Sequence, residues 1–130
     1  MSTGITEDKV YALLAMGINF KDTYQIDDPT VGSFALIDST VSRIDPITGL
    51  WREWNPMDRD DDALHLSYSI GMNINCGNDF VSVEHRLGMT RGLGFEDRGK
   101  AVRAAIYKAA ILLGKNPEDV DELRKGNSHA

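Results

Sequence analysis

The feature that most constrains how this chain can fold is a wide apolar stripe with helical spacing between residues 97 and 113. Apolar side chains that recur every three or four residues lie on one face of a helix, so the pattern predicts a helix over this range that ends at Gly114. Its many small alanines allow close packing, and Lys100, Arg103 and Tyr107 are predicted to point the other way. The stripe consists of Val102, Ala105, Ile106, Ala109, Leu112 and Leu113.

The rest of the chain alternates between short helices and short strands. A helix over 6–16 has Thr6 as its N-cap and stops at Gly17. A second helix follows the acidic run 57–62 and ends at Ile70, and a last one runs from Pro117 to about Lys125. Strands are predicted at 31–38, 41–44, 50–54, 72–75 and 80–87, with a hairpin-like turn at 45–49.

This alternation predicts an α+β fold, in which one mainly antiparallel sheet and the helices packed against it form a sandwich-like arrangement. A length of 130 residues fits a single domain over 1–130, with a frayed tail at 126–130. The apolar fraction of 42% with 26% charged residues is ordinary for a globular chain.

Several classes of protein are not expected. No apolar run approaches the roughly 20 residues that cross a bilayer, and the first ten residues lack the order of a signal peptide. We therefore expect a cytoplasmic protein with no membrane partner. A lone cysteine, Cys76, agrees with this placement because it can form neither an internal disulfide nor a zinc site.

The net charge of −6 argues against nonspecific nucleic-acid binding, which requires basic residues to neutralise phosphates. The charge is unevenly distributed: residues 1–84 hold 5 basic and 14 acidic side chains, and residues 109–130 hold 3 and 4. Between them, residues 85–108 hold 6 basic and 2 acidic side chains, a local charge of +4. One short cationic segment therefore stands in an otherwise acidic chain.

The cationic segment is the predicted ligand site. Guanidinium groups bind phosphate bidentately, and a loop at 91–98 that contains glycines leads into a helix, although it matches no known phosphate-loop pattern. The residues assigned to phosphate binding are Arg86, Arg91, Arg98, Lys100 and Arg103. The alternative is that these arginines pair with the acidic groups of the protein itself.

Aromatic residues add a predicted stacking surface for a base, formed by Trp51, Trp54 or Tyr107. Because side chains alternate along a strand, the two tryptophans should face opposite ways, so that one of them anchors the core.

The acidic run predicts neither a metal site nor a catalytic centre. Asp58, Asp60 and Asp62 match the opening of an EF-hand loop, but Ala63 and Ser69 stand where that loop needs glycine and glutamate. A helix start with solvated carboxylates is the expected structure. Asp61 and His65 lie four residues apart and are expected to form a surface ion pair, since no nucleophile pattern accompanies them. No cofactor is implied.

Two stretches resemble a group of small bacteriophage proteins. They are Trp54-x-Pro56-x-x-x-Asp60-x-x-Ala63-Leu64 and Ala101-x-Arg103-Ala104-Ala105-Ile106-x-x-Ala109. Over about residues 50–114 the chain is similar to the phage α-β-α sandwich and NinX-like proteins. That resemblance implies a phage accessory protein in the host cytoplasm, of a kind that often counters host defence, and it supplies no catalytic residues.

Together these observations favour a non-enzymatic binding module that sequesters an anionic, nucleotide-like signal molecule. The alternative is an acidic inhibitor that binds a host defence protein or DNA-binding protein, and the least favoured is a small hydrolase using Asp61 and His65. The alanine-rich helix and the small size of the chain also suggest a homo-oligomer, with sites at subunit interfaces.

Overall fold

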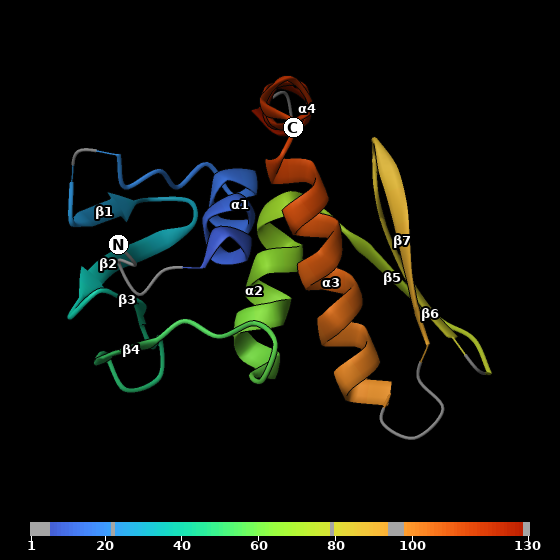
Figure 1. The fold of residues 1–130 in the computed structure, drawn as a ribbon, viewed down its shortest axis with the longest axis horizontal. Helices are drawn as coiled ribbons and strands as arrows, with labels where there is room; N and C mark the ends of the chain where they lie inside the picture. Colours follow the sequence, from blue (N-terminus) through green and yellow to red (C-terminus); the bar gives the residue numbers. More distant parts are fainter. Residues whose placement is uncertain (1–5, 22, 79, 94–97, 129–130) are drawn as a thin grey trace.

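Helix α3 (Arg98–Gly114) lies at the centre of the molecule, and the other elements pack around it (Figure 1). The computed structural model describes residues 6–21, 23–78, 80–93 and 98–128. Helices α1 (Glu7–Ala15) and α2 (Asp60–Ile70) flank α3 on one side, and α4 (Pro117–Ser128) crosses its end.

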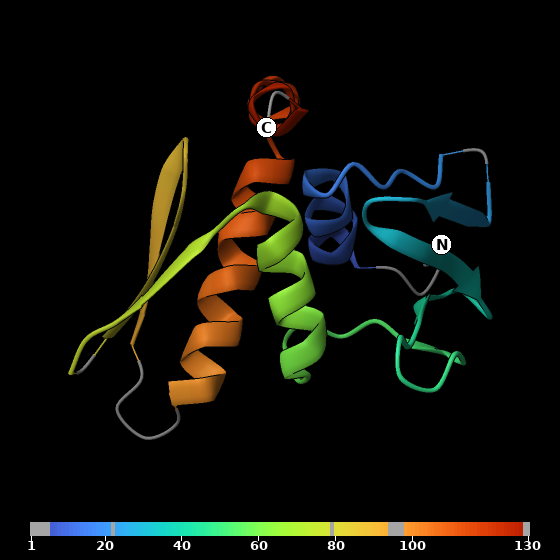
Figure 2. The same ribbon diagram turned by 180° about the vertical axis from the view of Figure 1, so that it is seen from behind.

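Two antiparallel sheets enclose the helices, where the sequence predicted one. Sheet A has the strand order β1-β2-β3-β4 and sheet B the order β5-β6-β7. They lie on opposite sides of the helical layer, so the layers run sheet, helices, sheet (Figures 1 and 2). The strands are β1 (Gln25–Asp28), β2 (Gly32–Ile37), β3 (Thr40–Ile44), β4 (Trp51–Glu53), β5 (Asn73–Cys76), β6 (Phe80–His85) and β7 (Gly88–Leu93). The prediction of an α+β class is confirmed, and the prediction of a single sheet is wrong.

Strands β1 and β7 are the two that the sequence did not reveal. Strand β1 contains one apolar residue, Ile26, and β7 contains two glycines, so both have low intrinsic strand preference. Pairing with a neighbour supplies what the local sequence lacks: Ile26 lies opposite Phe34 on β2, and β7 pairs with β6 along its whole length. Gly92 also allows β7 to approach α3, since a β-carbon there would lie 3.0 Å from the carbonyl oxygen of Ala101.

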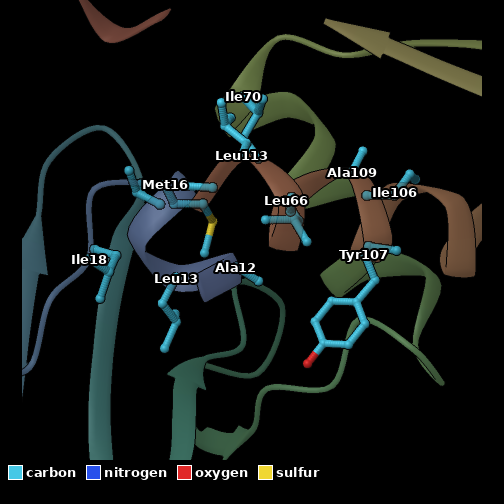
Figure 3. Close-up of a cluster of buried hydrophobic side chains, with 14 of the residues drawn as sticks. Ala12, Leu13, Met16, Ile18, Leu66, Ile70, Ile106, Tyr107, Ala109 and Leu113 are labelled. Atoms are coloured by element: carbon cyan, nitrogen blue, oxygen red, sulfur yellow. The ribbon is translucent and has the colours of Figure 1, made fainter. Parts of the chain in front are cut away.

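The core surrounds α3 on more sides than the apolar stripe predicted (Figure 3). Tyr107, expected to point away from the core, is only 9% exposed, whereas Leu112, expected inside it, is 53% exposed. Helix α3 contacts α1, α2, β6 and β7, so a single apolar face does not describe its surroundings. Tyr107 is therefore part of the packing between helices, and Leu112 lies on the stripe of α3 that stays open to solvent.

Local signals at the chain turns are confirmed. Thr6 caps α1 by accepting a hydrogen bond from the backbone N–H of Lys9 at 3.3 Å. The turn at 45–49 closes with the N–H of Gly49 donating to the carbonyl oxygen of Asp45 at 2.8 Å. Helix α4 runs to Ser128, past the predicted end at Lys125, so residues 126–128 are helical rather than frayed. Within the described ranges, no helix is both long and apolar enough to cross a membrane.

The close approach of Gly114 on α3 to α1 gives a stability prediction. A β-carbon on Gly114 would lie 1.8 Å from the backbone carbonyl oxygen of Tyr11 on α1. Because backbone atoms cannot swing aside, Gly114→Ala should lower the free energy of unfolding by about 2–3 kcal/mol or more. Gly88→Ala is the control, since its β-carbon would meet only ordinary contacts with the His85 ring at 3.6 Å. Urea denaturation of both variants measures the difference, and equal stability of the two would contradict the packing argument.

Candidate functional site

Two of the predicted phosphate-binding side chains, Arg86 and Arg103, form hydrogen bonds to other parts of the protein. Arg86 follows β6 and donates a hydrogen bond to the carbonyl oxygen of Glu122 on α4. Arg103 on α3 donates to the carbonyl oxygen of Met57 at 2.9 Å and to the carboxylate of Asp60 at 2.7 Å. Both arginines thus join elements of the fold, and Arg103, whose partner is the carboxylate of Asp60, fits the alternative that these arginines pair with the acidic groups of the protein itself.

Arg91 differs from these two arginines. It is exposed on β7, and its guanidinium carbon lies 4.2 Å from the centre of the Phe80 ring. Among the carboxylates that the structure describes, none forms an ion pair with Arg91. Lys100 is exposed in the first turn of α3, and the Arg98 side chain lies outside the described part.

The three residues predicted to stack on a base do not form one surface. Trp54 is fully buried and packs edge-on against Phe34, with ring centres 5.9 Å apart, so it is the tryptophan that anchors the core. Trp51 is partly exposed on sheet A, across the helical layer from Arg91. Burial, together with the nearby charge of Asp8, raises the pKa of Tyr107 to about 12. Neither Trp54 nor Tyr107 offers an open face to a base.

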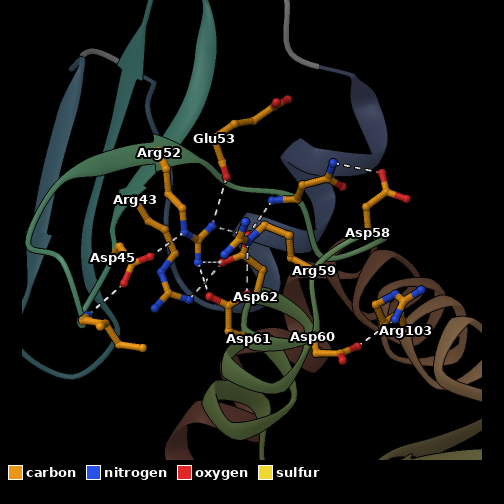
Figure 4. A network of polar contacts seen from close by, with 12 residues as sticks. Arg43, Asp45, Arg52, Glu53, Asp58, Arg59, Asp60, Asp61, Asp62 and Arg103 are labelled. Carbon is orange, nitrogen blue, oxygen red and sulfur yellow. Dashed lines mark hydrogen bonds and ion pairs between the residues drawn. The ribbon is translucent and has the colours of Figure 1, made fainter.

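The best-defined polar arrangement in the molecule is centred on Asp62 (Figure 4). Its carboxylate is completely buried and accepts hydrogen bonds from Arg43 at 3.1 Å, from Arg52 at 2.8 and 3.0 Å, and from the N–H of Asn55 at 2.7 Å. Arg43 and Arg52 lie directly opposite each other on β3 and β4. The two arginines of sheet A therefore hold the first turn of α2.

Sequence reasoning missed this arrangement because it treated the acidic run as a solvated helix start. The available signal was the hairpin itself: strands predicted at 41–44 and 50–54, joined by a short turn, place Arg43 and Arg52 close together. Two neighbouring cations on one sheet face require a carboxylate, and the run at 58–62 is the densest source of carboxylates in the chain.

The remaining groups of the network are closer to solvent. Arg52 also contacts Asp45 at 3.1 Å and Asp61, and Arg59 donates to Asp61 at 3.2 Å. Burial raises the pKa of Asp61, but the hydrogen bond from Arg59 and the charge of Arg52 outweigh it, and the pKa is lowered. The hydrogen bond from the Ile47 N–H and the one from Arg52 likewise lower the pKa of Asp45. Most of the acidic run is thus engaged inside the protein.

His65 does not form the surface ion pair predicted with Asp61. Its Nε2 donates a hydrogen bond to the carbonyl oxygen of Val31 at 2.6 Å, and its ring lies against Phe34 with centres 6.1 Å apart. Burial lowers the pKa of His65, and the charge of Arg43 lowers it further. The side chain faces sheet A instead of solvent, because α2 is packed on both that side and the side facing α3.

No family model, no curated protein and no solved structure matches this chain. Among the residues that the structure describes, no three His, Cys, Asp or Glu side chains form a group that could hold a metal ion. The candidate site therefore rests on its own geometry.

The candidate site is a row of side chains across the outer face of sheet B. Asn75 on β5 lies opposite Ser82 on β6, and Ser82 lies opposite Arg91 on β7. Directly paired residues share a face, and the alternate residues Val81 and Val83 are buried on the side of α3. The row thus presents an amide, a largely buried hydroxyl and a guanidinium on the side facing away from α3.

The hydrogen bonds of Asp62 predict that removing its charge destabilises the protein far more than removing the charge of Asp58. Asp62→Asn removes the charge that compensates Arg43, which is only 7% exposed, and should lower the free energy of unfolding by about 3–5 kcal/mol. Asp58→Asn is the matched control, because that exposed carboxylate accepts from the Asn55 side chain at 3.0 Å and should change stability by less than about 1 kcal/mol. Urea denaturation tests both, and comparable losses would contradict a special role for Asp62.

The lowered pKa of His65 predicts how the stability of the protein depends on pH. Its pKa in the folded protein lies below the ordinary value of 6.5, so on acidification the unfolded chain takes up a proton first. Stability is therefore complete above pH 6.5 and declines as the pH falls toward the folded pKa. His65→Gln should flatten the decline in unfolding free energy between about pH 7.5 and 5.5. Burial also lowers the pKa of His85, so His85→Gln and the double variant separate the two contributions. An unchanged slope in His65→Gln would refute the assignment.

Proposed function

We propose that the protein is a non-enzymatic binding module for an anionic, nucleotide-like small molecule, with Arg91 as the group that binds phosphate. The observation that carries the proposal is the exposed Arg91 guanidinium lying 4.2 Å from the Phe80 ring. A guanidinium held against an aromatic ring keeps its N–H groups available for phosphate oxygens and its other face available for a base.

The surroundings of Phe80 support this role because they hold the ring in place. A β-carbon on Gly77 would lie 2.3 Å from the Phe80 ring, so the ring rests directly on the Gly77 backbone. The ring is therefore supported from below while Arg91 lies over it. Asn75, exposed on the far side of Ser82, adds an amide that can donate to a phosphate or accept from a base.

The other two functions have less support. An acidic inhibitor would present the run 58–62 to its target, but Asp60, Asp61 and Asp62 are engaged with Arg103, Arg52 and Arg43. A hydrolase built on Asp61 and His65 would need the two side chains to meet, and each has a different partner. In the role implied by the resemblance to small phage proteins, the module would counter host defence by sequestering a nucleotide signal in the host cytoplasm.

Isothermal titration with cyclic dinucleotides and ADP-ribose derivatives tests the proposal. Arg91→Ala should weaken binding by roughly 10- to 100-fold, since a hydrogen bond to a charged group contributes about 1.5–3 kcal/mol. Phe80→Leu should give a smaller loss, because it keeps apolar bulk but removes the ring under the guanidinium. Lys108→Ala, an exposed cation on α3, is the control and should bind normally. Failure of every ligand to bind, or unchanged affinity in Arg91→Ala, would overturn the proposal.

A further inference from the structure

Residues 63–78 form the longest stretch of the chain without Asp, Glu, Lys or Arg, although 26% of all residues are charged. The stretch covers most of α2, the turn at Gly71 and all of β5. Much of it lies at the surface: Tyr68 is 89% exposed, Leu64 is 49% exposed, and Asn73, Asn75 and Cys76 are also exposed. The exposed part of this stretch is called the neutral surface below, and it is bordered on β6 by Glu84, which lies opposite Asn73.

The edge of sheet B at β5 belongs to this neutral surface. The other edge strands of the two sheets all carry charge: Asp27 and Asp28 on β1, Arg52 and Glu53 on β4, and Arg91 on β7. Charged side chains on edge strands prevent unwanted pairing with other chains. Strand β5, with the sequence Asn-Ile-Asn-Cys, has neither charge nor proline, so its edge is open to an added strand.

The register shows which backbone groups of β5 face outward. Gly77 donates its N–H to the carbonyl oxygen of Phe80 at 2.8 Å, so these two residues form a hydrogen-bonded pair. Hydrogen-bonded and non-bonded pairs alternate along an antiparallel ladder, which makes Asn75 the next residue bonded to β6. The N–H and carbonyl groups of Ile74 and Cys76 therefore point to the free edge.

A groove beside this edge offers apolar side chains to an incoming strand. It has a volume of about 380 Å³ and lies where α2 is followed by β5. Leu64 and Tyr68 line it from the helix, Met72 lines it from the connection after the helix, and Ile74 lines it from the strand. Backbone groups and apolar contacts are thus available together, as in recognition by strand addition.

We infer that β5 pairs with β5 of a second copy of this chain, in antiparallel orientation about a twofold axis at Asn75. In this register Ile74 lies opposite Cys76 of the partner subunit, and the reverse, so the outward-facing groups of both residues are satisfied in both chains. Sheet B then continues as six strands across the axis. The groove beside each β5 receives the end of the partner's strand.

Charge identifies the occupant as a second copy. Each chain carries a net charge of −6, so two copies repel each other over most of their surfaces. The surface at 63–78 and β5 is where that repulsion is weakest. A basic partner would instead be drawn to the acidic remainder of the chain.

The dimer and the proposed ligand site share Asn75, but the role assigned to Arg91 does not require the dimer. Six strands spaced about 4.8 Å apart would place the two Arg91 positions roughly 24 Å from each other, so each would act alone. Loss of the dimer would therefore leave phosphate binding by Arg91 intact, and loss of ligand binding in Arg91→Ala would leave the dimer intact.

Charge exchange at the axis tests the dimer. Because Asn75 faces itself across the axis, Asn75→Lys and Asn75→Asp should each be monomeric in sedimentation analysis, and an equimolar mixture should recover the dimer. Asn73→Lys is the matched control: it places the same charge on the same face of the strand, but opposite Gly77 of the partner subunit, and should stay dimeric. Wild type that is monomeric up to about 100 µM, or a mixture that stays monomeric, would overturn the inference.

A second pair of variants distinguishes the contribution of the Cys76 backbone N–H to dimerisation from that of its thiol. Cys76→Pro removes an outward N–H that is not bonded to β6, so it should abolish dimers while circular dichroism shows the fold intact. Cys76→Ser keeps the N–H and should dimerise like the wild type under reducing conditions. A dimeric Cys76→Pro, or a monomeric Cys76→Ser, would contradict pairing through this edge.

Discussion

The structure depends on one buried carboxylate. Asp62 is fully enclosed, and its burial is tolerable only because two guanidinium groups and a backbone N–H satisfy its oxygens. Those donors come from β3, β4 and the segment after β4, whereas Asp62 belongs to α2. The requirement to satisfy this group therefore fixes the register of the β3–β4 hairpin and the position of α2 on sheet A at the same time.

Pairing within the fold also explains why the net charge of a sequence segment overstates the charge that the folded segment presents at the surface. The segment 85–108 carries +4, but Arg103 extends across to Asp60, so part of its positive charge compensates the acidic run. Arg86 is engaged by a carbonyl of α4. The positive charge that the segment can offer to a ligand is therefore smaller than +4. The clearest remaining group is Arg91, whose guanidinium lies over the Phe80 ring and not beside a carboxylate.

Elements set by local signals could be predicted, and those set by distant partners could not. The cap at Thr6 and the turn at 45–49 depend on groups within four residues and were predicted correctly. Strands β1 and β7 exist because β2 and β6 offer them pairing groups. The burial of Asp62 and the turning of His65 toward Val31 likewise depend on sheet A, which no pattern within 60–70 reveals. Among the predicted phosphate-binding side chains that the structure describes, Arg91 is exposed and forms no ion pair with a described carboxylate, and these are properties of the folded chain that no local pattern reveals.

The two sheets consequently have different roles. Sheet A turns its arginines inward, where the Asp62 network uses them to bind the helices, so its charged groups serve stability. Sheet B turns Val81 and Val83 inward and keeps Asn75, Ser82 and Arg91 on its outer face, so these three polar side chains lie on the side away from α3. Polar groups that do not stabilise the fold are free to contact a ligand or a partner. Sheet B contains both the exposed guanidinium of Arg91 and the uncharged edge strand β5. Sheet A and the helices therefore form the scaffold, and sheet B forms the surface that we propose for recognition.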